Sequence, residues 1–277
     1  MPVGTLVAFH AHPDDEALLD AGTLARAAQA GHRVVLVLAT RGGAGDVGDG
    51  VLAQDGALGQ RRSVDAQASA DALGIARVAF LDYADSGHAP AEDGEWPAGT
   101  FCAAPVEEAA AALAQILTEE DATLLIADDD NGGYGHPDHV QVNRVARAAA
   151  AHAAIPLVLA TIDREFLSGG IELAKGMGFE VPEGFVPSDL STWYTPNAQI
   201  THTSDVSGVL DRRRASMAAH ATQTTGAPDT VRTLAVFLGL PEDIFAIAFS
   251  TEWFVLADGA NASVPDAFAD LLAPVVR

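Results

Sequence analysis

Two short segments of the chain gather histidine and aspartate side chains that could bind a metal ion. The first is AHPDDE at 11–16, and the second is GGYGHPDH at 132–139. In each segment two potential ligands are three residues apart, so that within a helical turn they point to the same side. Imidazole nitrogen and carboxylate oxygen without thiolate suit zinc in a catalytic site of three protein ligands. The pairs are His12 with Asp15 and His136 with His139.

Such a zinc ion keeps its fourth position for water, whose pKa it lowers to about 7. The two segments hold more acids and imidazoles than three ligands require. One carboxylate can therefore act as base for the water, and one imidazole can act as acid for a leaving amine. Two other functions use the same residue types. A phosphoesterase would need a second metal about 3.5–4 Å away, and a non-catalytic sugar- or metal-binding protein would need no base.

The elements that must position these segments follow a repeated strand–helix pattern, in which helical stretches stop at glycines such as Gly31 and Gly74. The pattern predicts an α/β fold, a Rossmann-like, doubly wound and mostly parallel sheet of order about 3-2-1-4-5. The expected strands are 5–10, 33–39, 78–81, 123–127 and one that Pro156 opens. The expected helices are 15–30, 60–73, one after Pro105 and one after Pro137.

In this order the first and fourth strands are neighbours where the winding direction reverses. Ligands of such folds bind there, outside the carboxyl ends of the strands. The segments at 11–16 and 132–139 each follow one of these two strands. The topology therefore predicts that both face one crevice, although more than a hundred residues separate them.

We expect the chain to consist of a Rossmann-like catalytic core at 1–161 and a C-terminal cap with late strands at 162–277, which complete the cleft within the same compact unit. After Ile162 glycines and prolines predict irregular chain up to about Asn197. The later expected elements are strands at 199–203, 245–249 and 253–256 and a helix at 206–219.

Composition excludes several kinds of partner. Fifteen Lys and Arg against 38 Asp and Glu give a net charge of −23, which repels nucleic acid and anionic membranes. The longest apolar runs are too short to cross a bilayer. The N-terminus has no basic region followed by an apolar stretch, and we expect a cytoplasmic protein. Cys102, the single cysteine, forms no intrachain disulfide. The composition predicts no particular oligomeric state.

Other features are weaker candidates for a site. Residues 43–48 match G-x-G-x-x-G, but they follow the second expected strand and no helix opens directly after them, so a loop is favoured over a nucleotide site. Cys102 has no neighbouring histidine in the sequence, and no G-x-S-x-G elbow is present, so nucleophilic catalysis is not predicted. His88 is expected on the surface and His10 as a hydrogen-bonded polar residue near the sheet end. His220 fits either a helix C-cap or the cleft.

The two intact motifs AHPDDE and GHPDH, with the spacing and strand pattern over about 4–160, resemble the PIG-L/LmbE family of zinc-dependent N-deacetylases. The resemblance implies one zinc ion, or another divalent metal, and an N-acetylated amino sugar as substrate. The implied metal ligands are His12, Asp15 and His139. The implied catalytic residues are Asp14 as general base, His136 as general acid or stabiliser of the tetrahedral intermediate, Asp138 as the group that tunes His136, and Tyr134 as a donor to the carbonyl.

Two substrate-binding residues are also implied by the resemblance, Arg62 in the helix that opens near Gln60 and Asp85 in Asp-Ser-Gly. The stretch NGGYGHPDH and the Ala-His-Ala-Thr-Gln stretch that ends at Gln223 look most similar to the mycothiol-pathway branch. Members of that branch deacetylate N-acetylglucosaminyl-inositol or cleave mycothiol conjugates. Gly43 stands where many relatives have an acid, which removes one polar contact to such a sugar.

Overall fold

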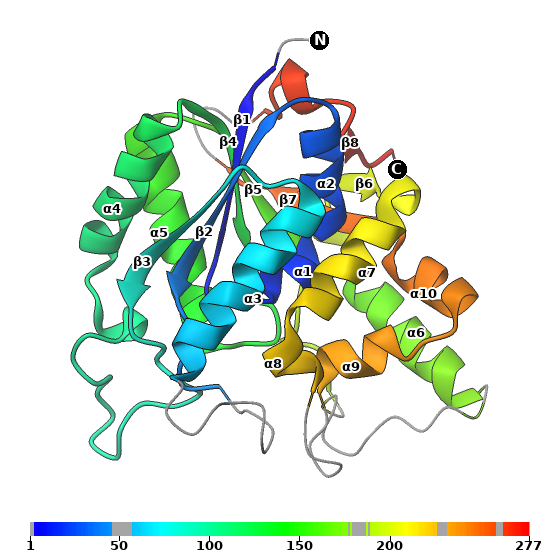
Figure 1. Cartoon of the computed structure of the whole chain (residues 1–277), viewed down its shortest axis with the longest axis horizontal. Coiled ribbons are helices and arrows are strands. Elements are labelled where there is room, and N and C mark those ends of the chain that lie inside the picture. Colours follow the sequence, from blue (N-terminus) through cyan, green and yellow to red (C-terminus); the bar gives the residue numbers. More distant parts are fainter. Residues whose placement is uncertain are drawn as a thin grey trace.

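The structure, a computed structural model, describes residues 3–45, 57–176, 178, 187, 189–225, 232–258 and 263–276. Its centre is an eight-stranded sheet of order β3-β2-β1-β4-β5-β7-β6-β8 (Figure 1). The first five strands are parallel, and β7, β6 and β8 continue the sheet antiparallel. The predicted order 3-2-1-4-5 is confirmed. The strands are β1 Thr5–His10, β2 Arg33–Thr40, β3 Arg77–Tyr83, β4 Ala122–Asp128, β5 Leu157–Thr161, β6 His202–Asp205, β7 Thr251–Leu256 and β8 Ala273–Pro274.

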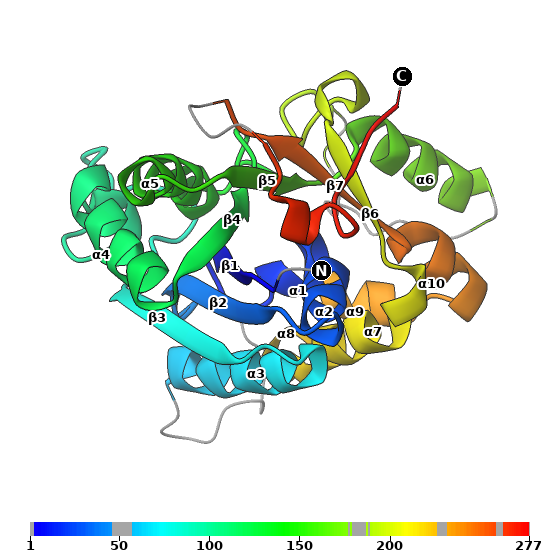
Figure 2. The same ribbon diagram turned by 90° about the horizontal axis from the view of Figure 1, so that it is seen from above.

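Helices cover both faces of the sheet, with α4 and α5 on one side and α2 and α3 on the other (Figure 2). Successive side chains of a strand point to opposite faces of the sheet, so each strand offers an apolar row to the helices on either side. In β1, Leu6 and Ala8 pack in the cluster with α2 and α3, whereas Val7 and Phe9 pack with α4 and α5. The helices are α1 Asp15–Leu19, α2 Ala21–Gln29, α3 Leu58–Leu73, α4 Val106–Glu119, α5 Pro137–Ala153, α6 Arg164–Gly176, α7 Leu210–Ala219, α8 Ala221–Thr224, α9 Thr233–Leu238 and α10 Glu242–Phe249.

Several local expectations differ from the structure. The strand expected at 199–203 begins only at His202, after a 3-10 turn at Asn197–Gln199. The helix expected at 15–30 is divided at Asp20, whose side chain is fully buried against His10. The region after Ile162 was expected to be irregular but begins with helix α6. The strand expected at 245–249 is wrong, because these residues belong to α10. Phe245 and Phe249 are four residues apart and bury the same helix face, and a short apolar run alone does not distinguish this pattern from a strand.

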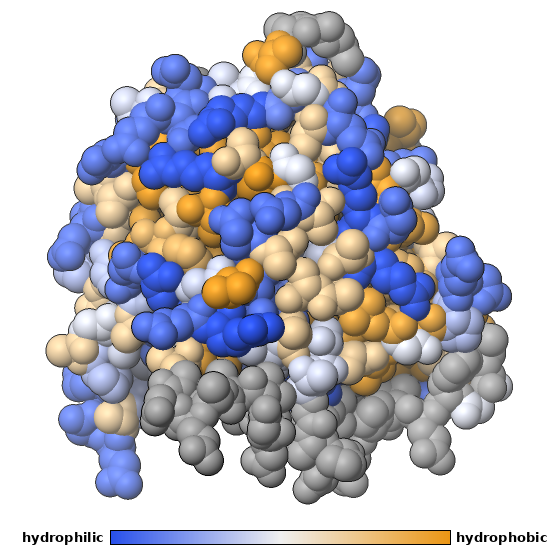
Figure 3. Space-filling view, in the orientation of Figure 1, coloured by the Kyte–Doolittle hydropathy of each residue, from blue (hydrophilic) through white to orange (hydrophobic). Residues whose placement is uncertain are grey.

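The surface mixes polar and apolar residues on the face that α3 and α7 present (Figure 3). Among the described helices none is both long and apolar enough to cross a membrane.

Candidate metal and catalytic site

The carboxyl ends of β1 and β4 lie side by side, with Phe9 paired to Ala127. The turns that follow these strands therefore meet at the carboxyl end of the parallel strands, which lies at the bottom of Figure 1. The ring centroids of His12 and His139 are 5.3 Å apart, and those of His12 and His136 are 4.8 Å apart. The parallel order thus brings the two motifs into one site, as the sequence predicts.

Asp15 lies between the two histidines predicted to bind metal. Its Oδ2 is 3.7 Å from His12 Nδ1, and its Oδ1 is 3.4 Å from His139 Nε2. The backbone N–H of His12 donates to Asp15 Oδ2 at 2.8 Å, which holds the carboxylate in place. All three side chains are buried. Asp15 therefore lies beside both histidines, but the three predicted ligands together are not one of the groups whose candidate ligand atoms all lie within 4.8 Å of one another.

The donor atoms fit a divalent cation. His139 Nε2 is buried and has no hydrogen-bond partner among the described residues. Leaving such an atom unpaired is unfavourable, and a cation between it and Asp15 would satisfy it. Three overlapping groups bring candidate ligand atoms within 4.8 Å of one another. They are His12 with His136 and His139, His12 with Asp85 and Asp138, and Asp15 with Asp128 and His139.

Asp14, the predicted base, occupies the turn between β1 and α1 with φ of 114°. Its Oδ1 accepts a hydrogen bond from Arg62 Nη2 at 2.9 Å, and the same nitrogen donates to the carbonyl of Pro13. Gly42 allows the guanidinium to lie against the backbone, because a Cβ at this position would collide with it. Burial raises the pKa of the Asp14 carboxyl above its ordinary value, although the Arg62 charge acts to lower it.

His136 has one ring nitrogen already bonded, since its Nδ1 accepts from the backbone N–H of Asp138 at 3.2 Å. Burial and the charges of His12 and His139 lower the pKa of His136 to about 3, although Asp138 acts to raise it. At neutral pH the ring is therefore neutral and carries its proton on Nε2. The carboxylate of Asp138 faces His12 Nε2 at 3.2 Å instead of the His136 ring, so its effect on His136 is through charge.

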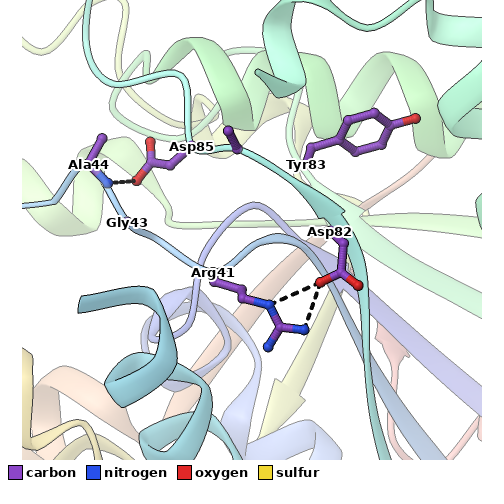
Figure 4. A pocket seen from close by; sticks show the side chains of 7 residues that line it. Arg41, Gly43, Ala44, Asp82, Tyr83 and Asp85 are labelled. Carbon is purple, nitrogen blue, oxygen red and sulfur yellow. Dashed lines mark hydrogen bonds and ion pairs between the residues drawn. The ribbon is translucent and has the colours of Figure 1, made fainter. Parts of the chain in front are cut away.

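Tyr134 and Asp85 border the site on two sides. The Tyr134 ring is 5.4 Å from His139 and 6.0 Å from His136 between centroids, and 40% of the residue is exposed. Asp85 Oδ1 lies 3.6 Å from His12 Nε2. The Asp85 carboxylate accepts from the backbone of Ala44, and both residues line an open cavity of about 460 Å³ (Figure 4). In this view Tyr83 points away from Asp85.

The family model described as "PIG-L: GlcNAc-PI de-N-acetylase" matches residues 7–150. A 1D-myo-inositol 2-acetamido-2-deoxy-alpha-D-glucopyranoside deacetylase of Streptomyces avermitilis is 34% identical, over 95% of each chain. The enzyme of the same name from Nakamurella multipartita is 36% identical over 85% of each. The chain belongs to the PIG-L family. This confirms the resemblance seen in the two motifs.

Solved structures of lower identity share the fold of this PIG-L chain. An N,N'-diacetylchitobiose deacetylase from Pyrococcus horikoshii has a TM-score of 0.57 at 19% identity and covers 92% of this chain and 84% of its own. The zinc-inhibited form of the teicoplanin deacetylase Orf2 has a TM-score of 0.56 at 20% identity, with 92% and 100% covered. At such identities the similarity establishes the fold alone.

A second layer of buried charged residues lies behind the PIG-L motifs, and little in the sequence predicts it. His139 Nδ1 is 3.0 Å from Asp128 Oδ2, and Asp128 Oδ1 is 2.6 Å from His10 Nδ1. His10 Nε2 is in turn 3.2 Å from Asp20. His10 is hydrogen-bonded, as expected. The one feature of the sequence that marks Asp128 is its place at the end of the fourth strand.

Other histidines and the cysteine differ in how well their environments were predicted. His88, expected on the surface, is exposed but has its ring 4.7 Å from that of His136. Cys102 Sγ donates to Asp138 at 3.1 Å, and burial together with that carboxylate raises the pKa of its thiol to about 12. The thiol therefore stays protonated, which agrees with the absence of a predicted nucleophile. The G-x-G-x-x-G stretch extends beyond the described residues at 46–48.

One further aromatic side chain reaches the site from the C-terminal part of the chain. The Trp193 ring lies 6.0 Å from the Tyr134 ring, and hydrogen bonds from Arg164 to the carbonyls of Trp193 and Tyr194 hold this segment. Nothing in the local sequence distinguishes Trp193 from a core aromatic residue. Only the folded chain places it beside Tyr134.

Proposed function

We propose that the protein is a zinc-dependent N-deacetylase that hydrolyses the acetamide of an amino sugar and releases acetate and a free amine. The observation that carries the proposal is the unpaired, buried His139 Nε2 beside Asp15 and His12, with Asp14 and His136 in the same site. This arrangement would provide a cation site, a carboxylate that can accept a proton and an imidazole that can donate a hydrogen bond. Its relatives in the PIG-L family are named as deacetylases.

The proposed substrate is a 2-acetamido-2-deoxy-glucopyranoside. Several relatives are named for the inositol-linked form of this sugar, and a structure with the same fold is named for N,N'-diacetylchitobiose. The group common to these substrates is an acetamide on a pyranose ring. Glucosaminyl-inositol compounds are therefore the first substrates to test.

His12, Asp15 and His139 would hold the zinc ion. Zinc, when bound, would polarise the acetyl carbonyl and lower the pKa of a water to about 7. Two histidines and one carboxylate leave a net charge of +1 on such a centre, which favours the negative charge that develops on the carbonyl oxygen.

Asp14 would accept the proton of the attacking water. Its carboxylate is tied to Arg62 by one oxygen, and the pKa of its carboxyl is raised above the ordinary value by burial, the direction that a general base at neutral pH requires. As the carbon–nitrogen bond breaks, the proton gained from the water returns to the leaving amine, so that the carboxylate is regenerated.

His136 would act through the proton on Nε2. Because Nδ1 is occupied by the Asp138 backbone, the neutral ring can donate only from Nε2. This favours a hydrogen bond from Nε2–H to the oxygen of the tetrahedral intermediate, because loss of that proton would leave an imidazolate and Asp14 already returns one proton to the departing nitrogen. Tyr134, half exposed beside His136 and His139, is proposed as a second donor to the carbonyl oxygen.

We also propose that the reaction takes place in the cytoplasm, on a small N-acetylated sugar or glycoside, without nucleic acid or a membrane as partner. The excess of 38 acidic over 15 basic residues disfavours phosphate backbones and anionic lipid. A single, half-buried cysteine agrees with a reducing compartment.

The test is release of a primary amine from a panel of N-acetylated sugars by the zinc-loaded protein. The panel contains N-acetylglucosaminyl-inositol, N,N'-diacetylchitobiose and N-acetylglucosamine, with phosphate monoesters as controls. We expect amine release, no phosphate release and one zinc per chain. Phosphate release with two metals per chain would contradict the proposal and identify a phosphoesterase.

A further inference from the structure

The backbone of Asp14 adopts a conformation that residues other than glycine rarely adopt. Its φ is 114° and its ψ is −19°. Such a conformation persists only when surrounding contacts hold it. The Arg62 guanidinium binds the side chain of Asp14, and the Glu16 carboxylate binds its backbone, because Asp14 N–H donates to Glu16 Oε2 at 3.1 Å. The conformation of Asp14 therefore depends on how Glu16 is oriented.

Two residues from distant parts of the chain orient Glu16, namely Ser69 in α3 and His220 between α7 and α8. Its Oε1 is 2.6 Å from His220 Nε2 and accepts from the Ser69 hydroxyl, also at 2.6 Å. Glu16 and Ser69 are fully buried, and His220 is 1% exposed. One oxygen of Glu16 is thus held by His220 and Ser69, while the other is presented to the backbone of Asp14.

The segment on either side of His220 is held against α3 by hydrogen bonds. The Ser216 hydroxyl in α7 is 2.8 Å from that of Ser69 in α3. Asp65, also in α3, accepts from both the backbone N–H and the hydroxyl of Thr222. In Figure 1, α7 and α8 lie along α3, which they contact. These contacts join the C-terminal part of the chain to the turn that carries Asp14.

The two roles suggested for His220 by the sequence do not account for its side chain. His220 does lie at the C-cap of α7, but the cap uses its backbone. A contact with substrate would need exposed surface, which His220 lacks. A buried histidine–glutamate pair loses hydration that two apolar residues would not lose. An apolar pair, however, could not present an acceptor to the N–H of Asp14.

We propose that His220 is a positioning residue, which acts through Glu16 to fix the left-handed backbone of Asp14 and so to direct its carboxylate toward the attacking water. This inference rests on the proposed role of Asp14 as base. It explains why residues more than two hundred positions after the first motif belong to the same site. The metal ligands are not part of this support, so zinc binding should not depend on His220.

The test compares His220→Leu, which removes the donor, with His220→Gln, which retains an N–H that can reach Glu16. His152→Leu is the matched control, because His152 and Glu107 form an exposed pair of the same kind. We expect His220→Leu to lower kcat about 10- to 100-fold, with KM and the zinc dissociation constant within about twofold of wild type. His220→Gln should recover most of kcat, and His152→Leu should match wild type.

Two further readouts separate positioning from a general loss of structure. In an Asp14→Asn background, which lacks the base, His220→Leu should cause no further loss of kcat. A crystal structure of His220→Leu should show Asp14 without its positive φ. If His220→Leu does not fold, Glu16→Gln serves in the same comparisons. An equal loss of kcat in both backgrounds, weakened zinc binding, or an unchanged φ at Asp14 would overturn the inference.

The outcome also distinguishes this inference from the proposed function. If the wild-type protein releases no amine from any sugar, the proposed function fails. The φ of Asp14 in His220→Leu would still test whether His220 and Glu16 hold the backbone of Asp14. If the wild type is active and His220→Leu retains full kcat, the inference alone fails.

Discussion

Arg62 Nη2 donates to Asp14 Oδ1 at 2.9 Å and to the carbonyl of Pro13 at 2.6 Å, so that one nitrogen of helix α3 binds both the side chain and the backbone of the first motif. Arg62 is only 5% exposed. The guanidinium both holds the proposed base and opposes the rise in its pKa that burial causes. A contact between Arg62 and substrate stays a prediction from the family resemblance.

Arg62→Gln should shift the pH dependence of activity. The base works in its ionised form, and without the cation the pKa of the Asp14 carboxyl rises further. The acidic limb of kcat/KM should therefore move to higher pH, with a loss of about 10- to 100-fold at pH 7. Arg61→Gln, at the half-exposed neighbour, is the control. A raised KM with an unchanged acidic limb would instead identify Arg62 as a substrate contact.

Asp14→Ala and His139→Ala should separate catalysis from metal binding. Asp14→Ala is expected to keep zinc and to lose about 10²- to 10⁴-fold in kcat, because it removes only the base. His139→Ala should lose both zinc and activity. Zinc content after dialysis and the rate of amine release measure the two effects. Asp14→Asn checks that the loss comes from the carboxylate and not from strain on alanine at a positive φ. Retained turnover in Asp14→Asn would refute the base assignment.

Asp128→Asn should weaken metal binding. Asp128 lies between His10 and His139, and removal of its charge loosens the orientation of the His139 ring. Loss of such an outer partner typically costs about 10- to 100-fold in metal affinity. The zinc dissociation constant can be measured by competition with a chromogenic chelator. Asp130→Asn, at an exposed acid two residues further along the chain, should bind zinc like the wild type, and an equal effect in both variants would argue against this role.

Cys102 should be unreactive and dispensable. With a pKa of about 12, about one thiol in 10⁵ is ionised at pH 7, and alkylation requires the thiolate. Iodoacetamide should therefore label the native protein slowly, and Cys102→Ser should keep the deacetylase activity. Mass spectrometry of the labelled protein and the amine-release assay give the two readouts. Rapid labelling coupled to loss of activity would point to a nucleophile.

Glu252→Gln should destabilise the whole chain. Glu252, in β7, accepts from the backbone of Gly22 and Thr23 at the start of α2 and forms an ion pair of 2.9 Å with Arg213. Both side chains of the pair are buried, and breaking such a pair costs about 3–5 kcal/mol. Urea unfolding should show a single transition at a lower midpoint. Glu242→Gln, at an exposed acid, should leave the midpoint unchanged. Two separate transitions would show that the C-terminal part unfolds independently.

The sequence by itself determined the parallel order of the first five strands and the pairing of the two motifs. The strands are apolar runs bounded by glycine and proline, and right-handed crossovers leave few orders for them. Once β1 and β4 are neighbours, His12 and His139 must meet. Prediction failed where local pattern is ambiguous, as at Phe245 and Phe249, whose spacing fits either element when the run is short.

Only the tertiary structure decided the layer behind the motifs. Glu16 and His220 are 204 residues apart, and His10 and Asp128 are 118 apart. No local spacing in the sequence marks either pair. Each pair forms only because distant helices and strands pack closely and the side chains adopt the required rotamers. The metal-binding residues are encoded in short motifs, but their orientation arises from buried hydrogen bonds that form only when distant parts of the chain pack together.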